Sequence, residues 1–93
     1  MFHLAEDEFV PGNLLFANSN ALKTTDGTTS SLIAGASRSD GYTEGVGAAA
    51  RFDTIVSFVQ LSISYVILTD HHNHCLRSVD RRTNQTSTYS GNC

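Results

Sequence analysis

Short apolar runs recur along the chain and are separated by glycine, asparagine, aspartate and serine. The runs cover residues 13–17, 31–34, 55–59 and 65–68, followed by the more polar segments 76–79 and 86–89. Runs of this length between turn-forming residues are typical of β-strands, and no stretch keeps the 3.6-residue period of a helix. The pattern therefore predicts an all-β fold, with one helical turn at most, in the Ala-rich stretch 47–52.

An internal repeat links the two halves of the chain. Residues 22–26 (Leu-Lys-Thr-Thr-Asp) match residues 76–80 (Leu-Arg-Ser-Val-Asp), and each match is followed by a Thr-rich turn, a β run and a glycine, Gly35 or Gly91. The period is a little over 50 residues, close to the upper end of the range of roughly 20 to 50 residues that marks stacked or radial repeats. A propeller blade with a long loop would have this period.

The strand candidates in the second half become more polar towards the C-terminus. Residues 55–59 are apolar at four of five positions and residues 65–68 at all four, whereas 74–79 are apolar at three of six and 86–90 at one of five. The inner strands of a propeller blade are covered on both faces, while the outermost strand borders water. Strands of a two-sheet sandwich should instead alternate. The gradient favours antiparallel four-stranded propeller blades.

Two separated motifs resemble the NHL repeat family of β-propellers. Residues 65–80 (YVILTDHHNHCLRSVD) are similar to the family's strand, Asp, Asn-His and Leu-Arg pattern, and residues 40–52 (DGYTEGVGAAARF) are similar to its Gly-rich insertion. The resemblance implies a single partial propeller module over residues 1–93. Its parts would be an N-terminal segment (1–12), the outer part of one blade (13–35), a Gly-rich loop (36–52) and one complete four-stranded blade (53–93).

The resemblance also gives the motif residues mechanical roles. Asp70 and Asn73 are expected to form the tight turn between the second and third strands of the blade, with their side chains capping backbone N–H groups. Arg77 and Asp80 are expected to form a cross-strand or inter-blade ion pair. The remaining motif positions are His74 and Leu76 at the strand start and Gly41, Gly45 and Gly47, which would allow positive φ in the loop.

Three histidines are the main candidates for a metal site. His71, His72 and His74 lie within four residues, and some NHL-type lyases use histidine-bound zinc. On a strand, His72 and His74 would share a face and His71 would point away, and no companion ligand has a convincing spacing. We therefore expect no bound metal and no cofactor. The match of residues 45–50 to G-x-G-x-x-A lacks the preceding strand that dinucleotide binding needs, and it predicts a loop.

Two further features concern covalent modification. If the last hairpin turns near Thr83, Cys75 opposes about Gly91, and Cys93 lies two residues further along the same face. A diagonal Cys75–Cys93 disulfide is then geometrically allowed, and a buried free Cys75 with a free Cys93 is the alternative. Asn84 begins an N-glycosylation sequon. Both features favour an extracellular location only weakly, and the compartment stays open.

Composition and charge narrow the classes of partner. Six Lys plus Arg against nine Asp plus Glu give a net charge of −3, so no basic stripe attracts RNA. No apolar run approaches the roughly 18 residues of a membrane span. The N-terminus shows no secretory signal pattern, and the acidic residues Glu6, Asp7 and Glu8 are expected to lie in solvent.

These observations predict a non-catalytic protein-interaction or scaffold module. The chain holds too few blades to close a ring, so a longer propeller, copies of the chain or a protein partner should cover its flanks. Two alternatives remain open. One is a fragment of a metal-dependent NHL-type lyase, which zinc binding by the histidines would favour. The other is a stand-alone extracellular β domain that the Cys75–Cys93 bond would hold together.

Overall fold

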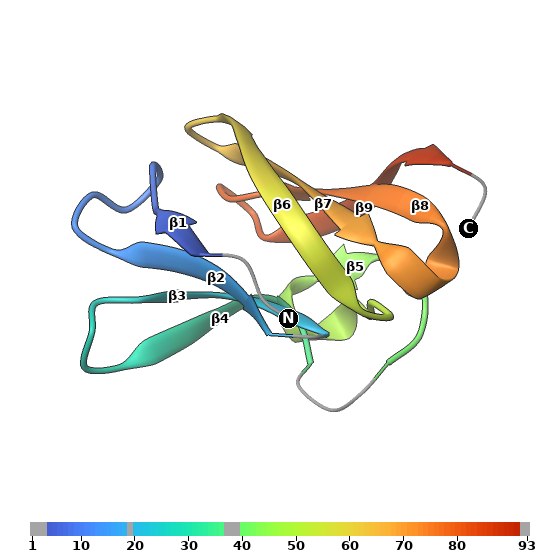
Figure 1. The fold of residues 1–93 in the computed structure, drawn as a ribbon, viewed down its shortest axis with the longest axis horizontal. Helices are drawn as coiled ribbons and strands as arrows, with labels where there is room; N and C mark the ends of the chain where they lie inside the picture. The colour runs from blue at the N-terminus through green and yellow to red at the C-terminus, as the bar shows by residue number, and fades with distance from the viewer. Residues whose placement is uncertain (1–3, 19, 37–39, 92–93) are drawn as a thin grey trace.

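The computed structural model describes residues 4–18, 20–36 and 40–91, which form two antiparallel sheets (Figure 1). The first sheet consists of β1 (Leu4–Glu6), β2 (Leu14–Asn18), β3 (Ala21–Thr25) and β4 (Ser30–Gly35) in sequence order. The second has the order β5-β9-β8-β7-β6, with β5 (Gly45–Val46), β6 (Ile55–Ser62), β7 (Tyr65–Asp70), β8 (Cys75–Asp80) and β9 (Gln85–Gly91). The 3₁₀-helices η1 (Gly47–Ala49) and η2 (His71–Asn73) are single turns. The predicted all-β antiparallel class is confirmed.

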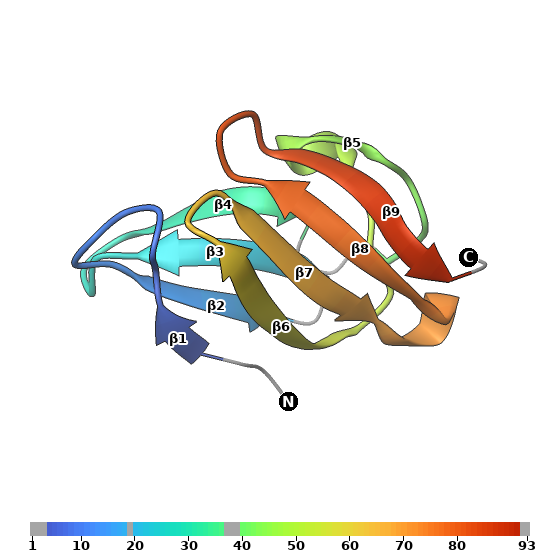
Figure 2. The ribbon, with the colours of Figure 1, turned by 90° about the horizontal axis from the view of Figure 1, so that it is seen from above.

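The two sheets lie face to face over one hydrophobic core. From above, the strands of the second sheet cross those of the first at an angle (Figure 2). Strand alternation sends Leu15 and Ala17 of β2 towards the core, to which Phe58 and Leu68 of the second sheet also belong. The full set of core residues is Leu15, Ala17, Leu22, Ile33, Ala34, Ala50, Phe52, Ile55, Phe58, Val66, Leu68 and Val79.

Both sheets contain four consecutive hairpin-connected strands, one more in the first sheet than the sequence pattern predicts. The additional strand is β1, which pairs with β2 through Leu4–Phe16 and Glu6–Leu14. It lies within the N-terminal segment 1–12, outside the apolar runs from which the strands are predicted. Its three residues are too few to show an alternating pattern, so the pairing with β2 defines it.

Strand β6 is partly exposed, contrary to the expectation that residues 55–59 are covered on both faces. Ile55 and Phe58 are buried against the first sheet, but Val59 points the other way and is 57% exposed. The strand lies at the edge of its sheet, and Leu61, two residues after Val59, is likewise exposed. An apolar composition therefore did not translate into burial on both faces.

The repeat between residues 22–26 and 76–80 has the same structural setting in both sheets. Strands β3 and β8 carry it, and in each sheet the register to the next strand shifts at the same repeat position, Leu22/Lys23 and Leu76/Arg77. Such shifts mark β-bulges. In the turns that follow, Asp26 accepts hydrogen bonds from the N–H groups of Thr28 and Thr29, and Asp80 accepts one from the N–H of Arg82. The two sheets are thus built as copies of one unit.

Among the residues that the structure describes, the helices are two single turns. Neither of these two turns is long and apolar enough to cross a membrane.

Candidate functional site

A buried ion pair between Asp70 and Arg77 lies on the inner face of the second sheet. Arg77 Nη1 donates to Asp70 Oδ2 over 2.7 Å, and both side chains are fully buried. Asp70 ends β7, and Arg77 is opposite Leu68 on β8, so the two side chains point to the same face one alternation apart. Arg77 also donates to the backbone oxygens of Arg51 and Thr43. It therefore connects the sheet to the loop that crosses from the first sheet.

Two aromatic rings complete the surroundings of the Arg77 guanidinium. Its central carbon is 4.4 Å from the centre of the Tyr42 ring and 5.1 Å from that of Phe52. Cation–π contacts of this kind strengthen when water is excluded. The Gly-rich loop thus folds over the second sheet because its aromatic residues pack on a buried cation.

The expectation of an ion pair between Arg77 and Asp80 is wrong, because each residue pairs with a different partner. The two residues are three apart on one strand, so their side chains point to opposite faces. Asp80 instead binds the guanidinium of Arg82 at 3.2 Å near the surface.

Asp70 and Asn73 lie at the turn between β7 and β8, but their side-chain hydrogen bonds reach segments outside it. Asp70 Oδ1 accepts a hydrogen bond from the Asp53 N–H at 2.7 Å, and the Asn73 amide donates to the Gly41 carbonyl and to Asp70 Oδ2. Neither side chain caps a backbone N–H of η2. Both tie the turn to the neighbouring segments 40–43 and 51–54, because the buried Asp70 carboxylate has several acceptor positions to fill.

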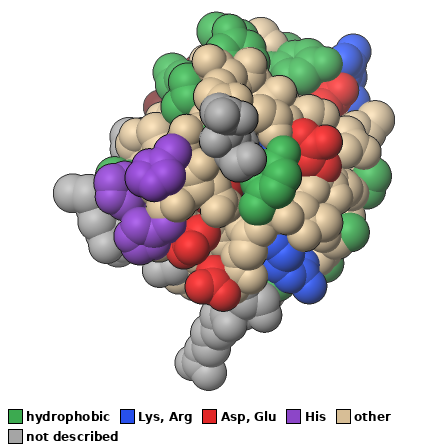
Figure 3. Space-filling model, turned by 90° about the vertical axis from the view of Figure 1, so that its right-hand side faces the viewer, with side chains coloured by type: hydrophobic (Ala, Val, Ile, Leu, Met, Phe, Trp, Pro, Cys, Tyr) green, Lys and Arg blue, Asp and Glu red, His purple; other side chains and the backbone are tan. Residues whose placement is uncertain are grey.

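The three histidines lie in a turn and not on a strand. His71 and His72 belong to η2, and His74 follows it with a left-handed φ of 59°. All three are exposed, and histidine side chains gather on one flank of the molecule (Figure 3). The rings of His71 and His72 have centroids 5.0 Å apart, and His72 Nδ1 lies 3.2 Å from Asp53 Oδ1. The strand alternation expected for them does not apply.

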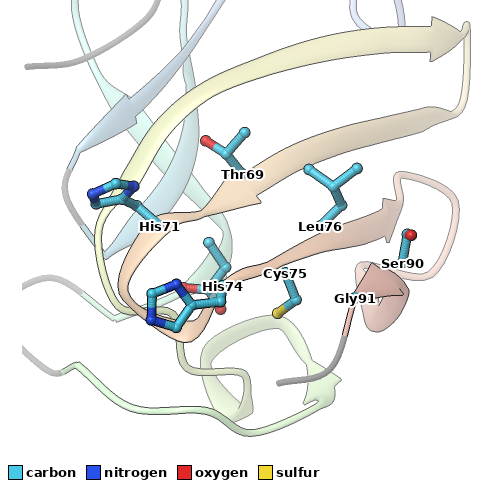
Figure 4. Close-up of a pocket in the computed structure, with 8 residues that line it drawn as sticks. Thr69, His71, His74, Cys75, Leu76, Ser90 and Gly91 are labelled. Atoms are coloured by element: carbon cyan, nitrogen blue, oxygen red, sulfur yellow. The ribbon is translucent and has the colours of Figure 1, made fainter.

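No group of three or more His, Cys, Asp or Glu side chains with a geometry for one metal ion occurs within residues 4–18, 20–36 and 40–91. His71 and His74 instead line a shallow pocket of about 360 Å³ above the start of β8 (Figure 4). Thr69 and Leu76, which are paired across β7 and β8, project to one side of it. Its other polar lining residues are Asp70 and Thr69 of β7 and Ser90 of β9.

A second buried ion pair joins the two ends of the described chain. Arg81, after β8, donates two hydrogen bonds to the Asp7 carboxylate at 2.7 and 3.0 Å. Asp7 is only 3% exposed and also accepts hydrogen bonds from the Thr24 hydroxyl and two backbone N–H groups. Phe9 lies over the Arg81 guanidinium, with 4.9 Å to the ring centre. The expectation that Asp7 lies in solvent is wrong.

These bonds change the acidity of Asp7. Burial by itself raises the pKa of a carboxyl group, but the hydrogen bonds from Arg81, Thr24 and the Val10 N–H favour the ionised form more strongly. Together they lower the pKa of Asp7 to about 2. Asp7 is therefore charged at neutral pH and clamps the first sheet to the turn after β8.

The other predicted positions divide into three groups. Gly41, Gly45 and Gly47 all have positive φ, as expected. Cys75 is disulfide-bonded and opposite Gly91, while Cys93 lies outside the described residues, so the Cys75–Cys93 pairing stays a prediction. Asn84 occupies the turn between β8 and β9 with a φ of 62°, and its glycosylation likewise stays a prediction.

The outer faces of the two sheets carry exposed apolar side chains in the described part of the chain. The first-sheet outer face consists of Leu4, Leu14, Phe16 and Leu32, of which Leu4 is 53% exposed. The second-sheet outer face consists of the exposed residues Val59, Tyr65 and Tyr89 together with the half-buried Leu76 and with Ile67, which is only 8% exposed between its neighbours. Apolar faces left open in this way mark interaction surfaces in folded proteins.

The fold has a counterpart among solved structures. An auxiliary nutrient binding protein from Bacteroides thetaiotaomicron superposes with a TM-score of 0.76 and 21% sequence identity over 97% of this chain. The chain spans about a quarter of that protein's length, since 25% of it is covered. No protein-family model and no curated protein matches the chain, so the NHL resemblance stays a prediction. The chain is accordingly described by its fold, an all-β pair of antiparallel sheets like part of this binding protein.

Proposed function

We propose that the chain is a non-catalytic interaction module, made of two consecutive propeller-type blades that resemble NHL repeats. The observation that carries the proposal is that two sheets built as copies of one unit pack face to face and leave an apolar outer face on either side. Repeat units of this kind gain much of their stability from the neighbours that cover such faces. The module would therefore bind further blades or a protein partner through these faces.

The buried polar groups support a structural and not a catalytic role. Asp70 and Arg77 are paired with each other and with backbone groups, and Asp7 is paired with Arg81. Each pair connects segments that are distant in the sequence. Groups held in this way fix the positions of the segments that they join, and these four side chains are engaged with one another.

The solved structure with the same fold is described as a binding protein, and the matched region is a quarter of it. We infer a similar arrangement here, in which these two sheets form one part of a larger binding assembly.

A tandem fusion tests whether the sheets behave as blades. Two copies of the chain would be joined by a flexible linker as long as the natural connection 36–54, so that the second-sheet outer face of one copy can meet the first-sheet outer face of the next. If both faces are blade faces, the fusion should unfold as a larger cooperative unit. In urea, its unfolding midpoint and m-value should both exceed those of the single chain.

The matched control is the same fusion with Leu14→Lys in the second copy only. This change puts a charge at the junction and leaves the first copy unaltered, so it should return the midpoint and m-value to those of the single chain. A fusion that unfolds like the single chain from the outset would refute the blade proposal.

A further inference from the structure

We propose that free copies of this chain associate head to tail, with the first-sheet outer face of one copy covering the second-sheet outer face of the next. The inference rests on the proposed function and names the partner as a second copy. Its basis is that the two sheets repeat one unit, so the packing already present between them defines which face fits which.

Positions on the first-sheet outer face correspond to core positions of the second sheet. With Lys23 matched to Arg77, strand pairing matches Leu14 to Val66 and Phe16 to Leu68. Val66 and Leu68 are both buried by the first sheet. Leu14 is instead 40% exposed, because no sheet precedes it in the described residues.

The strand β1 extends this correspondence to the edge of the sheet. Leu4 pairs with Phe16 as Phe58 pairs with Leu68. Phe58 belongs to the core, whereas Leu4 is exposed. The first-sheet outer face thus has the residue types and the positions of a surface that another sheet covers.

The second-sheet outer face corresponds to the core-facing side of the first sheet. Leu76 matches the fully buried Leu22, and Ile67 matches Leu15 across the same strand pairs. At the bulge of the last strand, Tyr89 takes the position of the buried Ile33. The second-sheet outer face of one copy can therefore pack on the first-sheet outer face of another copy. This contact would repeat the packing of the first sheet on the second sheet within one chain.

The match is between different faces, so the contact is heterologous. Each copy then offers one face of each kind, and association can continue beyond two copies until a ring closes. A symmetric dimer that pairs two first-sheet outer faces would bring together faces that never meet within the chain. These two arrangements predict different behaviour of single-face variants.

The experiment measures mass by analytical ultracentrifugation over a hundredfold range of protein concentration. The unaltered chain should form species larger than a dimer as concentration rises. Leu14→Lys in the first-sheet outer face and Leu76→Lys in the second-sheet outer face should each weaken association at least tenfold, because a buried lysine without a partner is unfavourable. Val59→Lys, at a more exposed position of the second-sheet outer face, serves as a second variant if Leu76→Lys does not fold.

The matched control is Ile63→Lys, which adds the same charge at an exposed position in the turn between β6 and β7 and should leave association unchanged. The decisive sample is an equimolar mixture of Leu14→Lys and Leu76→Lys chains. It retains one intact face of each kind, so it should form a one-to-one dimer that does not grow.

An unaltered chain that stays monomeric would overturn the inference, as would a Leu76→Lys chain that still dimerises alone or a mixture that remains monomeric. The tandem fusion separates this failure from failure of the proposed function. If the fusion is stabilised but free copies remain monomeric, the faces are blade faces that another partner covers. If the fusion also shows no stabilisation, the blade proposal itself fails.

Discussion

A few buried side chains connect the second sheet to the loop that leaves the first sheet. The ion pair of Asp70 and Arg77 is fully buried, and its hydrogen bonds reach the loop that leaves the first sheet. Taking two charges out of water is costly, so a pair of this kind adds little net stability but is expensive to break. What it contributes is a defined position for the loop over the second sheet.

Removal of the Arg77 charge is therefore expected to destabilise the folded chain strongly. Arg77→Met should lower the free energy of unfolding by about 3 kcal/mol or more, because Asp70 is left buried without a counter-charge. The double variant Arg77→Met with Asp70→Asn should recover part of this loss. Urea unfolding measures both, and Arg82→Met at the exposed pair with Asp80 is the control that should change little.

The Asp7 clamp should make stability depend on acid pH. The pKa of Asp7 is about 2 in the folded chain, against an ordinary value of 3.8. A carboxyl whose pKa is lowered on folding stabilises the protein above the unfolded value, and that stability is lost as pH falls through the folded value. The contribution, about 2 kcal/mol, should disappear between about pH 4 and pH 2.

Urea unfolding across this pH range checks the prediction. The difference in stability between the unaltered chain and Asp7→Asn should shrink as pH falls, because protonated Asp7 loses its ionic bonds to Arg81. A difference that stays constant down to pH 2 would contradict the clamp.

At the scale of elements, the ends of the hairpins decide how closely the sheets approach. Gly35 ends β4 with a φ of 90°, and a Cβ there would overlap the Asn20 carbonyl and lie 2.9 Å from Phe52 Cδ2. The absence of a side chain thus lets Phe52 pack into the core next to the first sheet. Gly91 has the same place at the end of β9, which again reflects the repeat.

Gly35→Ala should therefore destabilise the chain more than a positive φ alone would. Gly12→Ala is the matched control, since Gly12 has a φ of 95° but no atom near the added Cβ. Strain at positive φ is shared by both variants, so the difference between them isolates the clash. We expect Gly35→Ala to cost about 2 kcal/mol more in thermal or urea unfolding, and equal losses would show that Phe52 can move.

The last hairpin carries the disulfide prediction. Cys75 is opposite Gly91, as the sequence pattern predicts, and it is disulfide-bonded. Peptide mass analysis without reductant should find Cys75 linked to Cys93. Reductant should then lower the midpoint of unfolding, because the cross-link restricts the unfolded chain. Two free thiols, or an unchanged midpoint after reduction, would contradict this role.

At the scale of the whole molecule, one interface between two sheets is formed, and the outer faces remain uncovered in the described structure. The chain is small, so that a single core gives limited stability and each uncovered apolar face matters. This is why the association and tandem experiments bear directly on function. They measure whether the outer faces continue the packing that the two sheets already show.

The sequence alone determined the all-β class, most strand positions, the repeat and the pairing of Cys75 with Gly91. These features depend on local patterns: short apolar runs, turn residues and fixed spacings, which act over a few residues. The positive φ of Gly41, Gly45 and Gly47 was predictable for the same reason. Local alternation also decides which side chains of one strand share a face.

Only the tertiary structure decided which charged groups are paired. Asp7 and Arg81 are 74 residues apart, and no local pattern distinguishes Asp7 from its exposed neighbours Glu6 and Glu8. Arg77 lies between two acidic candidates, and its partner Asp70 follows from the direction of neighbouring strands and from the loop that covers them. Such pairs form where the sheets exclude water, and that depends on how the whole chain packs.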